Sequence, residues 1–150
     1  MKKIIFLSLL FFGITMNGYS QVGIGAGLGI YDGFTSALVN AEIPLSDSFS
    51  ISPSVEHSLA KYSDAFLFNL DAQYNFGDKD ALNFYPLAGV VVVTDFKRDA
   101  TLFDVGGGLN YAISDNIKLL GEAKYLITEE KIGHSRGGTY TIQFGVLFNL

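Results

Sequence analysis

The chain has 150 residues, of which 49% are hydrophobic and 17% charged, and its formal net charge at pH 7 is −5. This acidic balance argues against binding to nucleic acid or to an anionic membrane surface, because both attract basic proteins. The sequence contains no cysteine. It therefore predicts neither a disulfide framework nor the lipid-attachment cysteine of a lipoprotein.

The first 20 residues have the composition of an export signal. Two lysines precede an apolar run from Ile4 to Ile14, and a small-x-small pattern typical of a cleavage site ends at Ser20. The run is too short for a membrane-spanning helix, which needs about 20 apolar residues. We therefore expect a signal peptide over 1–20 and a mature domain over 21–150. The alternative interpretation is a buried N-terminal helix.

The mature part contains eight stretches in which apolar residues alternate with small or polar ones, separated by turn residues. Each has about 10 to 13 residues, close to the roughly 9–11 of a tilted membrane strand. No apolar window of about 20 residues remains for a helical span, so the mature chain can cross a membrane only as a closed sheet. The expected strands are 22–31, 35–45, 49–60, 65–76, 82–94, 101–113, 117–128 and 138–150.

The connections between these segments differ in length and charge. Three are tight turns, at 45–48, 77–80 and 114–116, and the other four include the longer and more charged segments 95–100 and 129–137. Transmembrane barrels have short turns on one side and long loops on the other. We therefore expect the four connections at 32–34, 61–64, 95–100 and 129–137 to be outward-facing loops, with both chain ends on the opposite side.

One face of the expected strands is continuously apolar, whereas the other carries mainly Gly, Ser, Asn and Gln. A water-facing surface would normally mix Lys and Glu of both signs. We therefore expect lipid outside and a polar interior, which in an eight-stranded barrel is only wide enough for side chains to fill. A soluble lipocalin-like barrel would instead turn its apolar face inward. The segment 82–94 is apolar on both faces, so the sequence does not decide which of its residues face the lumen. It also does not decide whether a bulge near Pro86 interrupts the strand.

The C-terminal strand carries a recognisable pattern. The spacing of Gln143, Gly145, Phe148 and Leu150 resembles the assembly signal of bacterial outer-membrane β-barrels, although that family usually ends in an aromatic residue. With its signal peptide and eight strands, the chain resembles the small barrels represented by the OmpA transmembrane domain and OmpX. The resemblance implies an all-β, eight-stranded antiparallel up-and-down transmembrane barrel in a Gram-negative outer membrane. It also implies a monomer without cofactors, surrounded by membrane lipids and lipopolysaccharide and assembled by the barrel-assembly machinery.

Six charged residues fall on the polar face and are expected to point into the lumen. We interpret them as a network of ion pairs and hydrogen bonds; a charged gate or an acidic lining for cations is the alternative. Lys124 is the one evident cation for five acids, so Lys118 or Arg98 must also reach inward, or some carboxylates must be protonated or hydrated. The candidate lumen residues are Glu42, Glu56, Asp71, Asp104, Glu122 and Lys124.

The glycines from Gly23 to Gly29 recur at every second residue. They lack the G-x-G-x-x-G step of a nucleotide-binding loop, so we interpret them as a strand with a bare inner face that makes room for larger side chains opposite. Together with Gly106 and Gly108 they could leave a thin water path through the barrel.

His57 and His134 each precede a serine, and some small outer-membrane barrels that modify lipid A use Ser and His near the outer rim. Adjacent residues on a strand point in opposite directions, which does not suit a nucleophile and its base. Two isolated histidines do not make a metal site. The sequence therefore favours a non-enzymatic structural or surface-interaction role, with a narrow pore and a lipid A-modifying enzyme as alternatives.

Overall fold

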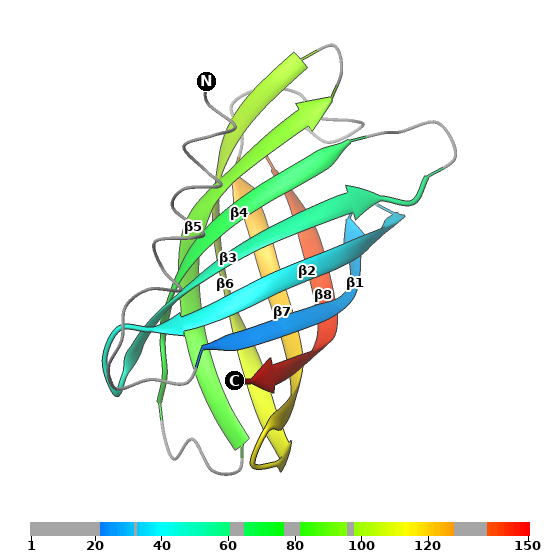
Figure 1. Ribbon diagram of the computed structural model, residues 1–150. Coiled ribbons are helices and arrows are strands. Elements are labelled where there is room, and N and C mark those ends of the chain that lie inside the picture. The colour runs from blue at the N-terminus through cyan, green and yellow to red at the C-terminus, as the bar shows by residue number, and fades with distance from the viewer. Residues whose placement is uncertain (1–21, 32, 61–64, 77–81, 96–97, 128–137) are drawn as a thin grey trace.

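The computed structural model describes residues 22–31, 33–60, 65–76, 82–95, 98–127 and 138–150. These residues form one closed barrel in which every strand is antiparallel to its neighbours in the sequence and the last strand pairs with the first (Figure 1). The strands are β1 (Gly23–Tyr31), β2 (Phe34–Pro44), β3 (Phe49–Ser58), β4 (Phe66–Tyr74), β5 (Leu82–Asp95), β6 (Arg98–Ser114), β7 (Ile117–Ile127) and β8 (Gly138–Asn149).

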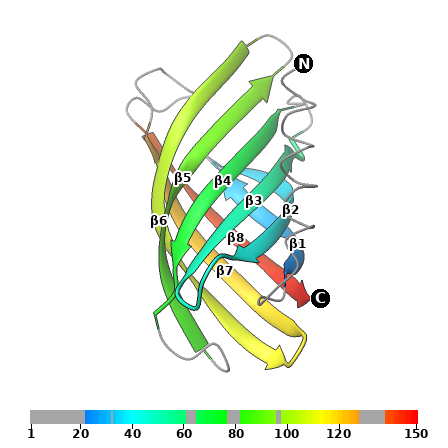
Figure 2. The same cartoon turned by 60° about the vertical axis from the view of Figure 1, so that its left-hand side comes forward.

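The predicted fold class is confirmed, and the strands lie close to their predicted bounds. One boundary was wrong: the segment 95–100 was expected to be a loop, but the ladder between β5 and β6 continues to the pair Asp95 and Arg98. Continuing the ladder gives the backbone N–H and C=O groups of this hairpin partners that a loop would leave to solvent. The hairpin rises above the neighbouring strands at one end of the barrel (Figures 1 and 2).

Side chains alternate between the lumen and the outer surface because successive residues of a strand point to opposite faces. In β4, Leu70 is 47% exposed, whereas its neighbours Asn69 and Asp71 are each 2% exposed. The same alternation places large apolar side chains on the outside of other strands, including Ile24, Leu28, Val39, Phe103, Val105, Leu119, Ile142 and Phe144. Among the described residues, no helix is long and apolar enough to cross a membrane.

The inner side of β5, which the sequence did not assign, includes Asn83, Tyr85, Leu87 and Val91, all buried. Pro86 faces outward, and the pairing of β5 with β6 runs past it without a bulge. Pro86 lies just beyond the last pair between β4 and β5, Gln73 and Leu87. A proline fits there because its missing N–H is not needed for the ladder.

The glycines of β1 leave space that side chains from neighbouring strands occupy. A Cβ atom added to Gly29 would lie 2.6 Å from Ser36 Oγ and 2.9 Å from Glu56 Oε2, and one added to Gly23 would lie 2.7 Å from Leu147. The sequence allowed a thin water path beside these glycines. The structure instead fills these parts of the lumen with protein side chains.

Candidate functional site

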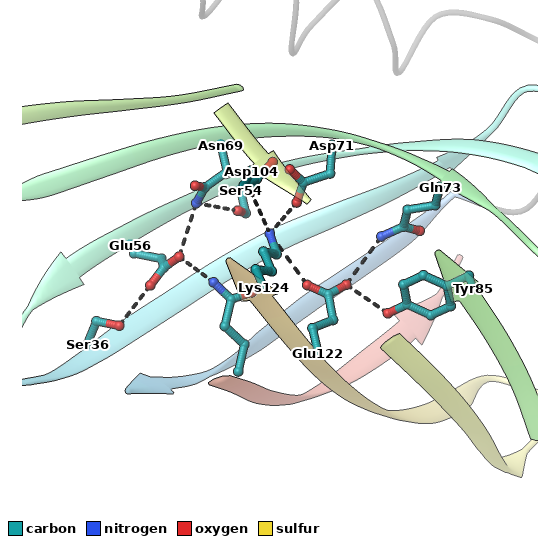
Figure 3. Close-up of polar contacts among 11 residues, drawn as sticks. Ser36, Ser54, Glu56, Asn69, Asp71, Gln73, Tyr85, Asp104, Glu122 and Lys124 are labelled. Carbon is teal, nitrogen blue, oxygen red and sulfur yellow. Dashed lines mark hydrogen bonds and ion pairs between the residues drawn. The ribbon is translucent and has the colours of Figure 1, made fainter. Parts of the chain in front are cut away.

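The centre of the lumen holds one lysine among three carboxylates (Figure 3). Lys124 of β7 is 3% exposed, and its Nζ forms an ion pair with Asp71 of β4. The same Nζ lies 3.6 Å from Glu122 Oε2 and 3.7 Å from Asp104 Oδ2. A buried ion pair repays its desolvation only when its geometry is good and other hydrogen bonds help. Removal of the Lys124 charge would therefore leave three buried carboxylates without a cation at this position.

Asp71 and Asp104 can converge because the strand between them carries a glycine. Gly89 of β5 pairs with Asp71 on one side and Asp104 on the other. A Cβ atom at Gly89 would lie 2.7 Å from Asp104 Oδ1 and would collide with Asp71 Oδ1. Within the described part of the chain, Asp71 Oδ1 and both carboxylate oxygens of Asp104 have no hydrogen-bond partner. Among the described side chains, Lys124 is the cation that forms an ion pair with Asp104.

Glu122, by contrast, accepts hydrogen bonds from neutral side chains. Tyr85 donates its O–H to Oε1 at 2.7 Å, and Gln73 donates Nε2–H to the same oxygen at 3.2 Å. Hydrogen bonds to a charged acceptor are roughly twice as strong as neutral ones. Among the described side chains, Glu122 therefore contacts two neutral donors and the cation Lys124.

A chain of side-chain hydrogen bonds runs from Gln73 toward the end of the barrel where β1 begins and β8 ends. Ser50 donates to Gln73 Oε1 at 3.2 Å, Asn75 donates to Ser50 Oγ at 3.2 Å, and Asn83 donates to Asn75 Oδ1 at 2.7 Å. Every donor in this chain points toward Glu122, so the side-chain dipoles favour negative charge on that carboxylate.

Glu56 of β3 forms a second buried centre, separate from the lysine. It is 2% exposed and accepts hydrogen bonds from Ser36 Oγ at 2.8 Å, from Asn69 Nδ2 at 3.1 Å and from Gln143 Nε2. Among the described side chains, no Lys or Arg forms an ion pair with Glu56. Three donors from β2, β4 and β8 thus take the place of a cation.

The sixth predicted lumen residue, Glu42, lies away from the Lys124 cluster. It is half-buried and lines a small cavity of about 10 Å³ together with Lys118, Asn75, Asn83 and Asn110. A volume of this size is at the lower limit for one water molecule. Lys118, one of the two cations expected to reach inward, therefore lines the lumen near Glu42 rather than near Asp71. The side chain of Arg98 lies outside the described residues.

The residues of the predicted assembly signal lie on β8 with different surroundings. Gln143 is buried in the lumen, and Gly145 pairs with Gly27 where β8 meets β1. Phe148 and Leu150 are 50% and 72% exposed. The signal itself stays a prediction.

The structure gives His57 and Ser58 separate partners. The His57 ring is tilted against Phe66, with ring centroids 4.5 Å apart. Ser58 Oγ accepts a hydrogen bond from the backbone N–H of Ala60 at 3.3 Å. His134 and Ser135 lie outside the described residues. In the part of the chain that the structure describes, no group of three or more metal-binding side chains is present.

Sequence reasoning missed an apolar cluster inside the barrel, which we call the apolar plug: Leu67, Val91, Leu102 and Leu126. Each lies in the half of its strand that is remote from the start of β1 and the end of β8. The alternation of the sequence could have predicted this cluster, because inward-facing residues recur at every second position. Leu126 is two residues from Lys124, and Leu102 is two residues from Asp104.

Comparison with known proteins identifies the fold. No family model and no curated protein sequence matches the chain. The N-terminal β-barrel domain of Pseudomonas aeruginosa OprF matches with a TM-score of 0.74 at 22% identity, over 89% of this chain and 100% of that one. A de novo designed transmembrane β-barrel matches with a TM-score of 0.66 at 12% identity, over 89% and 98% of the two chains. The outer membrane enzyme PagL matches with a TM-score of 0.58 at 11% identity, over 85% and 99%.

The protein therefore has the fold of the small eight-stranded outer-membrane β-barrels of the OmpA and OmpX type, as the sequence predicted. The same architecture is found in an enzyme and in a designed protein, so the fold alone does not assign a role.

Proposed function

We propose that this protein is a monomeric, non-enzymatic barrel of a Gram-negative outer membrane, with a structural or surface-interaction role and a closed lumen. The observation that carries the proposal is the segregation of its side chains. In β8, Ile142 and Phe144 are 43% and 58% exposed on the outside, whereas Gln143 between them is 2% exposed in the lumen. A transmembrane barrel needs this arrangement because its outer surface meets lipid.

The distribution of charge supports contact with lipid. In the described strand residues from Gly23 to Tyr74 and from Phe103 to Ile127, every Asp, Glu and Lys lies on the lumen side. These residues are Glu42, Glu56, Asp71, Asp104, Lys118, Glu122 and Lys124. A charge on the lipid-facing side would cost about 2–4 kcal/mol for Arg or Lys at mid-bilayer. The outer surface of these strands avoids that cost.

The packing of the lumen supports a closed barrel. The four side chains of the apolar plug are each no more than 7% exposed, and hydrophobic constrictions resist water and ions. Farther along the lumen, the polar side chains within the Lys124 centre and within the Glu56 centre form ion pairs and hydrogen bonds rather than line an open channel. We therefore favour a rigid scaffold over the narrow pore.

The histidine environment supports a non-enzymatic role. A nucleophile needs a base within hydrogen-bond reach, whereas His57 packs on Phe66 and Ser58 bonds to the backbone. The proposal further includes cleavage of the signal peptide after Ser20 and lipopolysaccharide and other membrane lipids around the apolar surface. It also includes recognition of Gln143, Gly145, Phe148 and Leu150 by the barrel-assembly machinery.

Membrane fractionation of cells that express the full chain tests the location, combined with gel migration before and after heating. We expect the protein in the outer-membrane fraction and a heat-dependent shift in migration. Planar bilayers should show no steady conductance, and mass spectrometry should show unchanged lipid A when the protein is expressed. A mature chain that folds in water without detergent would overturn the proposal.

A further inference from the structure

The outer surface of the barrel has a hollow across β5, β6, β7 and β8. Its volume is about 600 Å³. Its outward-facing lining combines small residues with large apolar side chains on β5, β6 and β8. The small residues are Gly107, Gly121 and Ala123, and the large ones include Phe84, Leu109, Ile142 and Phe144.

Strand register explains how the hollow arises. Gly121 pairs with Leu109 on β6 and with Phe144 on β8, and Ala123 pairs with Gly107 and Ile142. Because paired residues share a face of the sheet, the small residues Gly107, Gly121 and Ala123 adjoin one another on the outer face, between larger side chains of β5, β6 and β8. The depression is therefore part of the barrel wall rather than the result of a loop.

Gly121 has no steric reason to be glycine. A Cβ atom there would meet Phe144 at 3.8 Å and Leu109 at 3.9 Å, which are ordinary van der Waals contacts. The inward-facing Gly106 and Gly108 differ, because a Cβ atom at either would collide with neighbouring atoms. A glycine inside a strand weakens it and often marks a bulge, a tight bend, or a site where a ligand or another backbone approaches closely, and the ladders on both sides of Gly121 run through it without a bulge. Gly121 thus points to an occupant outside the barrel.

We propose that this hollow holds one acyl chain of a membrane phospholipid. The inference rests on the proposed membrane location, because the hollow is continuous with the apolar outer surface and its large residues Phe84, Ile142 and Phe144 belong to that surface. A slender methylene chain can reach the small residues between these side chains. A second copy of the barrel fits less well, because a two-fold contact sets the same patch against itself and would place hollow against hollow.

The test is native mass spectrometry of the mature protein. The protein is reconstituted in nanodiscs of phosphatidylethanolamine and phosphatidylglycerol and then released into mild detergent. We expect the wild type to retain one phospholipid under conditions that strip the surrounding lipids. Gly121→Leu should lose it, because the new side chain fills the hollow. The matched control is Ala41→Leu, which adds a leucine to the outside of β2, four strands from β6 around the barrel.

Ala123→Leu fills the same hollow and provides a second variant in case Gly121→Leu does not fold, which the heat-dependent gel shift reports. Equal lipid retention in the wild type and in both folded variants would overturn the inference, as would a wild type that enters nanodiscs but retains no lipid. A wild-type dimer that Gly121→Leu converts to a monomer would also overturn it, because the occupant would then be a second copy. Failure to enter nanodiscs at all would instead contradict the proposed function.

Discussion

Gln143 of β8 donates a hydrogen bond to the Glu56 carboxylate of β3, 87 positions earlier in the chain. The two strands are separated by β1 and β2 in the barrel, so across the lumen this bond links two strands that are not neighbours in the sheet. It complements the backbone pairing of β1 with β8.

Replacement of Gln143 by leucine should destabilise the barrel by about 1–3 kcal/mol, because a buried carboxylate loses one of its donors. Thermal unfolding in detergent measures the effect. Phe144→Leu, an apolar change on the outer side of the same strand, is the control and should have a small effect. Similar unfolding temperatures for Gln143→Leu and the wild type would contradict the role of this bond.

Lys124→Met should have a larger effect, of about 3–5 kcal/mol, because removing one partner of a buried ion pair leaves uncompensated charge. The affected groups are Asp71, Asp104 and Glu122, and the measurement is again thermal unfolding in detergent. Lys118→Met, at the half-buried end of the lumen, is the matched control and should cost less. An unchanged unfolding temperature for Lys124→Met would argue against the network.

Arginine substitutions on β8 test the contact with lipid. Ile142→Arg should cost roughly 2–4 kcal/mol if this position lies near mid-bilayer, and Tyr140→Arg, closer to the start of the strand, should cost about 0–1 kcal/mol. Guanidinium unfolding in phospholipid vesicles gives both values. Equal effects at the two positions would contradict the expected dependence on membrane depth.

The absence of tryptophan from the sequence allows a fluorescence test of orientation. A single tryptophan at the outward position of Leu70 should be quenched strongly by phospholipids brominated on their acyl chains. One at Leu45, in the turn between β2 and β3, should be quenched less because it lies at an end of the barrel. Strong quenching of a tryptophan at Leu45 but not at Leu70 would contradict this orientation, because the turn rather than β4 would then contact the acyl chains.

Local alternation made most of the strands predictable. Period-two patterns report which residues share a face, and they give the inward positions of Asp71, Asp104 and Lys124 without any knowledge of pairing. The pattern failed at 95–100, where charged residues suggested a loop although the ladder continues to Asp95 and Arg98. The charged composition of this segment indicates that its side chains contact water. The ladder instead depends on backbone N–H and C=O groups, which charged residues carry as well.

The contacts within the lumen were not predictable in the same way. The convergence of Asp71 and Asp104 depends on their both pairing with Gly89. Alternation excludes a shift in register by one residue but not by two, because a shift by two leaves every side chain on the same face. The bond between Glu56 and Gln143 further requires the stagger with which the barrel closes. The sequence therefore predicted the six charged residues of the lumen, but neither the apolar plug nor the division between the Lys124 and Glu56 centres.

All nine residues of β1 have partners on β8. One edge of β1, the first strand of the barrel, therefore stays unpaired until β8, the last strand, pairs with it. Contacts between such distant parts of a chain slow folding. Until that pairing forms, the sheet has two open edges, which are templates for aggregation. Loss of β8 would therefore do more than shorten the sheet, because it would leave β1 and β7 as permanently unpaired margins.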